Sequence, residues 1–162
     1  MRYYLSIGSN IGDRLSNTRR ATTFLKTIGT VLKVSSIYET SPVAMASDAG
    51  DFYNLVLCLD SHLSPHELLK ETKRFEKKMG RDVSRAAASH NKPRTMDIDI
   101  VLAEDRVIDT DDLTIPHREM HQRKFVLVPL SEIAPSAIHP VLNRPIIEIL
   151  SQLNAPGQIT KI

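Results

Sequence analysis

The sequence of 162 residues has little sulfur and few aromatic rings: one cysteine, no tryptophan and 5% aromatic residues. The lone Cys58 cannot form an internal disulfide, which excludes a disulfide-stabilised scaffold and leads us to expect a reducing, cytoplasmic setting. The first residues lack the basic and long apolar segments of a secretory signal. The longest apolar runs are far shorter than the ~20 residues that span a bilayer, so we expect no membrane segment.

The sequence also lacks an excess of charge of one sign. Its 21 Lys and Arg residues against 19 Asp and Glu residues leave a formal charge of +2, which by itself indicates neither nucleic acid nor an anionic membrane as a partner. With 41% hydrophobic and 25% charged residues, the chain is typical of a globular protein with one core. We therefore expect a single domain over residues 1–162. A monomer is the expected state, although composition does not indicate it.

Hydrophobic periodicity predicts the order strand, helix, strand, strand, helix, strand over the first two thirds of the chain. The second helix has the clearest start, because Ser64 is a good N-cap, Pro65 fits the first helical position and Glu67 completes a capping box. This order is the split βαβ arrangement of an α+β, ferredoxin-like fold, with an antiparallel sheet and helices packed on it. The expected strands are 3–7, 31–38, 52–59 and 96–102, and the expected helices are 14–28 and 65–79.

Two segments without periodicity, 40–51 and 81–93, are expected to be long loops, and loops of that length in a compact domain usually have a functional role. The C-terminal third is expected to extend the core. Its expected elements are a hairpin turn at 104–105 with a short strand at 106–108, a segment bounded by Pro116 and Pro129, and short helices near 130–133 and 145–153.

The most informative local pattern is the pair of aspartates in Met96-Asp97-Ile98-Asp99-Ile100. Because residues two apart in a strand share a face, Asp97 and Asp99 project together, roughly 7 Å apart at their Cα atoms, while their apolar neighbours enter the core. Paired carboxylates at that spacing suit one or two Mg²⁺ ions that take their remaining ligands from water and substrate phosphate. The alternative is that this strand face is simply wet, since acidic side chains are common on surfaces.

Opposite charges are concentrated in two consecutive segments. Residues 71–94 contain eight basic and three acidic side chains, whereas residues 97–112 contain seven acidic and one basic side chain. Such a junction suits a magnesium–polyphosphate complex, in which cations neutralise phosphate oxygens and carboxylates hold the metal. Arg81 and Arg94 are the strongest candidates for these cations. A solvated helix face is favoured for three lysines of the same segment, Lys73, Lys77 and Lys78.

His117 and Arg123 follow the acidic segment. A lone histidine is more often structural, but together the two side chains could donate hydrogen bonds to the phosphates of a nucleotide. A zinc site that pairs His117 with His121 is disfavoured, because the spacing matches neither known metalloprotease order and no cysteine joins it. The turn from Gly8 to Gly12 lacks the third glycine of a dinucleotide motif and the Lys-Ser/Thr of a P-loop. It predicts a tight turn beside the sheet edge and little more.

Six motifs stand in a consistent order over nearly the whole chain. The most specific is Pro-Arg-Thr-Met-Asp-Ile-Asp at 93–99. The others are Gly-Ser-Asn at 8–10, Ser-Ser-Ile-Tyr-Glu-Thr-Ser-Pro at 35–42, Phe-Tyr-Asn at 52–54, Gly-Arg at 80–81, and Ile-Pro-His at 115–117 through Arg-Lys-Phe at 123–125. Together they resemble the 6-hydroxymethyl-7,8-dihydropterin pyrophosphokinase family of folate biosynthesis.

The resemblance implies a magnesium-dependent transferase that moves the β,γ-pyrophosphoryl group of ATP to the hydroxymethyl oxygen of the pterin and releases AMP. It implies that Asp97 and Asp99 hold two Mg²⁺ ions, and that Arg81 and Arg94 clamp the triphosphate as catalytic cations. It also implies a set of residues around ATP: Arg74, Glu76, Ile100, Thr114, His117 and Arg123.

For the second substrate, the resemblance implies a pterin stacked between Phe52 and Phe125. A flat heterocycle with a polar edge binds well between two aromatic faces, with a few donors and acceptors fixing its orientation. The residues implied to bind that edge are Thr40, Ser41, Val43 and Asn54.

Three alternatives stay open at this point. A ferredoxin-like RNA-binding module would need aromatic residues on one sheet face, but the chain has only four Phe and four Tyr and places two acids on a strand. An inactive relative that only binds pterin or nucleotide would be expected to lack one of the four charged candidates, and all four are present. A pyrophosphokinase for thiamine or ribose phosphate would keep the reaction class and change the acceptor.

Overall fold

The computed structural model describes residues 1–41, 50–80 and 95–162. Its centre is a six-stranded sheet in which every pairing is antiparallel. The strands are β1 (Arg2–Ser9), β2 (Thr30–Val34), β3 (Tyr38–Thr40), β4 (Phe52–Asp60), β5 (Asp97–Ala103) and β10 (Ile159–Lys161).

The strands of the sheet follow the order β10-β3-β4-β1-β5, with β2 also paired to β4. This order and the intervening helices form the predicted split βαβ arrangement, which confirms an α+β, ferredoxin-like fold. The strand expected at 31–38 is divided into β2 and β3. Between them the hydroxyl of Ser35 accepts a hydrogen bond from the N–H of Val56, so a side chain replaces one step of the backbone ladder.

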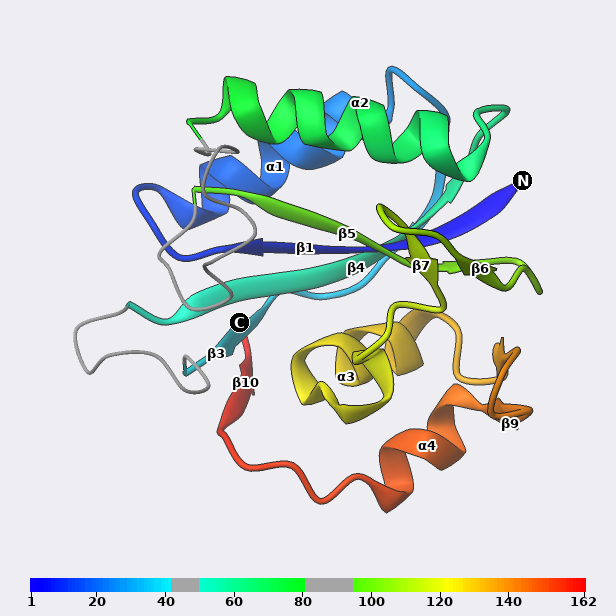
Figure 1. Cartoon of the computed structure of the whole chain (residues 1–162). Coiled ribbons are helices and arrows are strands. Elements are labelled where there is room, and N and C mark those ends of the chain that lie inside the picture. Colours follow the sequence, from blue (N-terminus) through cyan, green and yellow to red (C-terminus); the bar gives the residue numbers. More distant parts are fainter. Residues whose placement is uncertain (42–49, 81–94) are drawn as a thin grey trace.

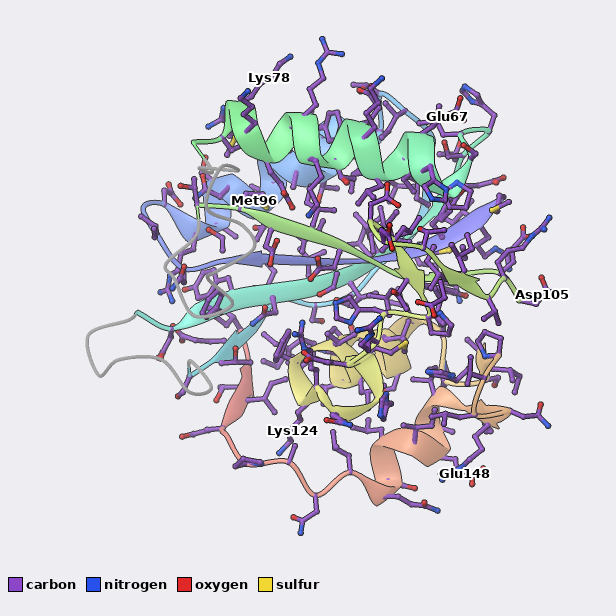
Figure 2. All side chains as sticks on the ribbon, in the orientation of Figure 1. Glu67, Lys78, Met96, Asp105, Lys124 and Glu148 are labelled. Carbon is purple, nitrogen blue, oxygen red and sulfur yellow. The ribbon has the colours of Figure 1, made fainter. Side chains whose placement is uncertain are left out.

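Two helices, α1 (Arg14–Leu25) and α2 (Pro65–Lys78), cover one face of the sheet (Figure 1). Asp13 caps α1 through the N–H of Ser16, and Ser64 with Glu67 forms the predicted capping box of α2. Glu67 and Lys78 lie at opposite ends of α2 (Figure 2). The core beneath these helices contains alternate residues of three strands: Tyr3, Leu5 and Ile7 of β1, Leu55, Leu57 and Leu59 of β4, and Ile98 and Ile100 of β5.

In the C-terminal third, α3 (Lys124–Ile133) covers the opposite face of the sheet, and α4 (Ile146–Gln152) packs against α3 (Figure 1). A short 3-10 helix, Met120–Gln122, precedes α3. The expected helix at 130–133 was too short, because Pro129 was taken as a boundary and lies inside α3. An internal proline removes one backbone hydrogen bond, and burial of Val126, Leu127 and Leu130 against the sheet offsets that loss.

The hairpin expected after β5 does not form, because the short strand that follows the turn pairs with another strand. Residues Ile108–Asp109 form β6, which pairs with β7 (Thr114–Ile115) instead of returning along β5. Glu104 takes a positive φ of 50°, and its carboxylate accepts the N–H of Arg2, so the chain turns away from the sheet at that point. A second small hairpin joins β8 (Ile138–His139) to β9 (Arg144–Pro145). No helix among the described residues is long and apolar enough to cross a membrane.

Candidate active site

Two groups of predicted site residues lie on the same face of the sheet, the face covered by α3. Gly8 of β1 is paired with Asn54 of β4 on one side and with Asp97 of β5 on the other. Residues paired across antiparallel strands point to the same face. One row of the sheet therefore runs from Asn54 across Gly8 to Asp97, and the predicted pterin and metal residues are neighbours across β1.

The adjoining rows extend this arrangement. Asp99 is paired with Ser6, one row from Asp97, and Thr40 is paired with Phe52, one row from Asn54 on the other side. Ile98 and Ile100 point to the opposite face, into the core beneath α2, and are buried. The predicted alternation of β5 is thus confirmed, with both aspartates on one face and their apolar neighbours in the core.

Ionising both aspartates at once is unfavourable in the folded protein. Burial raises the pKa of Asp99, and the charge of Asp97 raises it further, while Lys73, His117 and Arg123 act in the opposite direction. A divalent cation between the carboxylates would relieve both costs. Among the residues that the structure describes, no three His, Cys, Asp or Glu side chains gather into a metal site. Two carboxylates alone suit Mg²⁺, which keeps waters and phosphate oxygens as its other ligands, better than zinc.

Glu76 holds the strand that carries the aspartates. Its side chain is fully buried, and its Oε1 accepts the backbone N–H of Ile98 at 2.7 Å. Lys73, one turn earlier on α2, lies 3.2 Å from the same carboxylate. Lys73 was expected on a solvated face and is instead half-buried beside the site, whereas Lys77 and Lys78 are exposed as predicted. Only the tertiary structure shows that Lys73 lies beside the candidate site, because helical periodicity does not distinguish the three lysines.

His117 and Arg123 lie in the electrostatic environment of Asp99. Burial lowers the pKa of His117, although the charge of Asp99 acts to raise it, so the ring is neutral at neutral pH. Its Nδ1 accepts the N–H of Glu119 at 3.2 Å, which assigns the ring proton to Nε2. Arg123 is paired with Glu119, and its guanidinium lies 5.6 Å from the centre of the Phe125 ring.

The predicted pterin residues include a fixed amide. Asn54 is buried, and its Nδ2 donates to the hydroxyl of Thr40 at 2.7 Å. Because this hydrogen bond uses Nδ2, the amide oxygen Oδ1 is on the other side, where it lies over Gly8. Phe52 is half-buried at the start of β4, and Phe125 is half-buried in the first turn of α3. Ser41 is exposed and adjoins Thr40.

Three of the predicted nucleotide residues make other contacts. Arg74 is exposed and pairs with Glu71 at 3.9 Å, and Ile100 is buried in the core. The hydroxyl of Thr114 on β7 donates to Asp109 at 3.4 Å. Their contacts with a nucleotide stay predictions. Three further predicted residues lie outside the described ranges: Val43, Arg81 and Arg94.

The turn expected from Gly8 begins later, because Gly8 and Ser9 of the Gly-Ser-Asn motif still belong to β1. The Ser9 hydroxyl donates to the carbonyl of Thr95 at 2.6 Å and accepts the amide of Asn17 at 3.1 Å. It thereby fixes the chain two residues before Asp97. The serine itself was part of a recognised motif, but its partner could not be identified before the strands were placed side by side.

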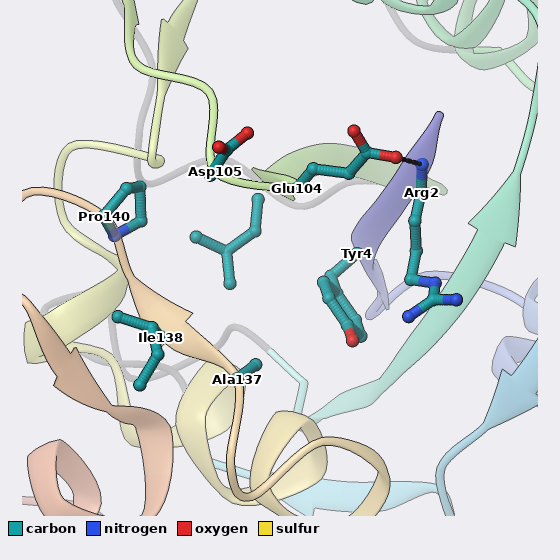
Figure 3. A pocket seen from close by; sticks show the side chains of 8 residues that line it. Arg2, Tyr4, Glu104, Asp105, Ala137, Ile138 and Pro140 are labelled. Atoms are coloured by element: carbon teal, nitrogen blue, oxygen red, sulfur yellow. Dashed lines mark hydrogen bonds between the residues drawn. The ribbon is translucent and has the colours of Figure 1, made fainter.

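A separate hollow of about 500 Å³ lies at the other end of β1 and β5 (Figure 3). Tyr4 and Leu102 lie in its wall, whereas Gly8 and Asp97 stand at the opposite ends of the same strands. Its remaining lining residues are Arg2, Glu104, Asp105, Ala137, Ile138 and Pro140. None of the predicted site residues lines it.

Comparison with known proteins gives the family of the chain. Residues 4–135 match the family described as 7,8-dihydro-6-hydroxymethylpterin-pyrophosphokinase. The 2-amino-4-hydroxy-6-hydroxymethyldihydropteridine pyrophosphokinase of Aquifex aeolicus is 39% identical over 145 residues, which cover 90% of this chain and 88% of that protein. The folic acid synthesis protein FOL1 of Dictyostelium discoideum is 41% identical over 140 residues, 86% of this chain but 20% of that protein. The chain thus spans about a fifth of the length of this longer relative.

The fold has a solved counterpart. A crystal structure of wild-type Plasmodium falciparum HPPK-DHPS with pteroate superimposes with a TM-score of 0.72 at 17% identity, covering 93% of this chain and 42% of that one. At that identity the likeness concerns the fold. With the sequence match over residues 4–135, it leads to one conclusion: the chain belongs to the 7,8-dihydro-6-hydroxymethylpterin-pyrophosphokinase family.

Proposed function

We propose that this protein transfers the β,γ-pyrophosphoryl group of ATP to the hydroxymethyl oxygen of 6-hydroxymethyl-7,8-dihydropterin in folate biosynthesis. The acceptor oxygen forms a bond to the β-phosphorus, the bond from that phosphorus to the α,β-bridging oxygen breaks, the hydroxyl proton is released, and AMP leaves. The observation that carries this proposal is the row from Asn54 across Gly8 to Asp97. In this row, the amide proposed to bind the polar edge of the pterin and a carboxylate proposed to bind the metal lie on the same face of the sheet.

Asp97 and Asp99 would hold two Mg²⁺ ions. The raised pKa of Asp99 and its cause, burial beside Asp97, are what a pair of carboxylates shows before a cation neutralises it. Bound Mg²⁺ would supply charge neutralisation and orientation for the phosphate oxygens. The arrangement also explains the position of Glu76, whose hydrogen bond with Ile98 holds β5 against α2.

The donors around the aspartates suit a triphosphate. We assign to His117 a neutral imidazole that donates its Nε2–H to a phosphate oxygen, and to Arg123 a cation held in place by Glu119. Arg81 and Arg94 are the proposed catalytic cations, on the strength of the family motif. Around the nucleotide we propose further contacts from Arg74, Glu76, Ile100 and Thr114.

The pterin would lie between Phe52 and Phe125, both half-buried at the face that α3 covers. Its polar edge would meet Asn54, whose orientation Thr40 fixes, together with Ser41 and Val43. The RNA-binding alternative is not favoured, because α3 and α4 bury Val56, Cys58 and Val101 on the face that such a module leaves open. We further propose that the chain acts as a single-domain monomer in the cytoplasm.

An acceptor comparison tests the proposal. Purified protein with ATP and Mg²⁺ is offered hydroxymethyl dihydropterin, thiamine or ribose 5-phosphate, and AMP is quantified by chromatography. We expect AMP only with the pterin and only with Mg²⁺ present. AMP formation with thiamine or ribose phosphate would redirect the substrate assignment, and ADP as the product would contradict pyrophosphoryl transfer.

A further inference from the structure

Glu132, in the last turn of α3, joins this helix to two strands at one edge of the sheet. Its Oε1 accepts the N–H of Ser36 at 3.1 Å and the hydroxyl of the same residue at 2.8 Å, and its Oε2 accepts the hydroxyl of Tyr38 at 2.6 Å. The Nζ atom of Lys161 lies 3.7 Å from Oε1. One carboxylate therefore connects α3 with β3 and β10, which lie side by side (Figure 1).

Tyr38 brings this connection onto the sheet face that α3 covers. It is paired with Asn54 across β3 and β4, and Asn54 is paired with Gly8 of β1. Residues paired across antiparallel strands point to the same face. Tyr38 therefore continues the row of the candidate site beyond Asn54, and the hydrogen bond from its hydroxyl to Glu132 connects that row to α3.

The two elements that Glu132 joins carry different residues of the proposed pterin site, and this inference rests on that proposed function. Phe125 lies in the first turn of α3, on the same face as Glu132, because residues seven positions apart share a helix face. Thr40 lies two residues after Tyr38 and accepts the amide of Asn54 at 2.7 Å. The separation between the Phe125 ring and the Asn54 amide thus depends on where α3 lies relative to β3.

Apolar packing alone does not fix that position. Buried side chains such as Val126 and Leu130 hold α3 to the sheet, and hydrophobic attraction has no preferred direction. Hydrogen bonds, in contrast, weaken steeply when donor and acceptor are misaligned. The three that Glu132 accepts come from two residues of one chain segment, so they specify one placement of the last turn of α3.

We propose that Glu132 is a positioning residue, which sets the distance between Phe125 and Asn54 by holding the last turn of α3 against β3. It acts through these two elements and not by contact with either substrate. Burial acts to raise the pKa of Glu132, but the hydrogen bonds from Tyr38 and Ser36 outweigh burial and hold this pKa below its usual 4.5. The carboxylate is therefore ionised at neutral pH and accepts all three hydrogen bonds.

Removing the carboxylate should weaken pterin binding without weakening nucleotide binding. For Glu132→Ala we expect about a fivefold loss of affinity for hydroxymethyl dihydropterin, a moderate effect because Lys33 still donates to the carbonyl of Ile133 at the same end of α3. Glu132→Gln keeps a carbonyl oxygen for Ser36, so it should recover part of that loss. Tyr38→Phe removes one of the three hydrogen bonds and should lose about twofold. In the Glu132→Ala background Tyr38→Phe should add nothing, since the partner of the hydroxyl is already gone.

Glu67 supplies a matched control on the opposite face of the sheet. Its Oε2 accepts the N–H and the hydroxyl of Ser64, each at 2.7 Å, as Oε1 of Glu132 does with Ser36. Glu67→Ala removes the capping box of α2, away from α3 and β3, and should lower the melting temperature by about a few degrees. It should bind pterin as the wild type does, which would separate the effect of Glu132 from a general loss of stability.

The experiment is titration calorimetry with hydroxymethyl dihydropterin in the presence of the magnesium complex of α,β-methylene ATP, which cannot release AMP. Circular dichroism first shows that each variant is folded. Binding of the ATP analogue alone should stay within about twofold of the wild type in every variant, because the carboxylate lies at the pterin side of the site.

The outcomes separate this inference from the proposed function. Wild-type protein that binds no pterin would overturn both. Wild-type pterin affinity in Glu132→Ala, an equal loss in Glu67→Ala, or a further loss from Tyr38→Phe in the Glu132→Ala background would overturn the inference alone. If Glu132→Ala does not fold, Glu132→Gln and Tyr38→Phe decide, and an unchanged pterin affinity in both would overturn it.

Discussion

The buried carboxylate of Glu76 accepts the backbone N–H of Ile98, the residue between Asp97 and Asp99, at 2.7 Å. In the described sheet β5 pairs only with β1, so this N–H points away from the ladder and would otherwise be unsatisfied. The helix α2 thereby fixes the strand that carries both candidate metal ligands.

Glu76→Ala should destabilise the protein by about 2 kcal/mol, because it leaves the Ile98 N–H and the Lys73 ammonium without this acceptor. Glu76→Gln keeps a carbonyl oxygen for Ile98 and should lose less. Urea unfolding measures both. If Glu76 served only as a nucleotide ligand, Glu76→Ala would weaken ATP binding without changing the unfolding midpoint.

Asp99→Asn should stabilise the metal-free protein. The pKa of Asp99 is raised, by burial and then by Asp97, so the folded state resists ionisation. In the unfolded chain the carboxyl group ionises above pH 3.8, its usual pKa, whereas in the folded protein it stays protonated to higher pH. The stability of the protein therefore falls as the pH rises from 3.8 to the pKa of the folded state.

In EDTA at about pH 7, Asp99→Asn should therefore melt a few degrees above the wild type, and the difference should vanish near about pH 3.5. Added Mg²⁺ should raise the melting temperature of the wild type more than that of the variant. A wild type as stable as Asp99→Asn in EDTA at neutral pH would contradict the electrostatic description of this pair.

Arg14 joins the start of α1 to residues beside the proposed pterin site. Its Nη1 lies 2.9 Å from Glu39 and donates to the carbonyl of Asp51 at 2.7 Å, and its guanidinium lies 3.9 Å from the centre of the Tyr53 ring. A double-mutant cycle of Arg14→Ala and Glu39→Ala should give a coupling of about 0.5–1 kcal/mol in unfolding experiments. Additive effects would show that the ion pair contributes nothing beyond its separate contacts.

His139 should make the protein acid-sensitive. Burial lowers its pKa below the usual 6.5, and the nearby ring of His121, 6.2 Å away between ring centres, lowers it further. Because the folded state holds His139 neutral, its contribution to stability is complete above about pH 6.5 and is lost as pH falls toward the folded pKa. His139→Gln should flatten the fall in melting temperature between about pH 7.5 and about pH 5, and an unchanged fall would contradict this role of His139.

Local patterns predicted much of this fold. The capping box of Ser64 and Glu67 located α2, and the alternation around Asp97 and Asp99 placed both carboxylates on one face. These features depend on residues close in sequence. The extent of α3 was missed because Pro129 was read as a boundary, although burial against the sheet is what decides whether a helix passes through a proline.

The parts of the site that could not be predicted depend on distant pairings. Glu76 of α2 accepts the N–H of Ile98, Ser9 bonds to Thr95, and Gly8 lies between Asn54 and Asp97. Each relationship joins residues far apart in sequence and depends on how α2, β4, β1 and β5 are placed side by side, which no local period specifies. The family motifs named the residues of the site, and strand register shows how some of them face one another.

The most direct test of the proposed site is AMP formation from ATP and hydroxymethyl dihydropterin by Asp97→Asn and Asp99→Asn, measured beside the wild type with Mg²⁺. Each variant should lose at least about 100-fold in rate, while circular dichroism and pterin binding show that the fold and the Asn54 half of the site are intact. A near-wild-type rate in either folded variant would contradict the assignment of these carboxylates to the metal ions of the reaction.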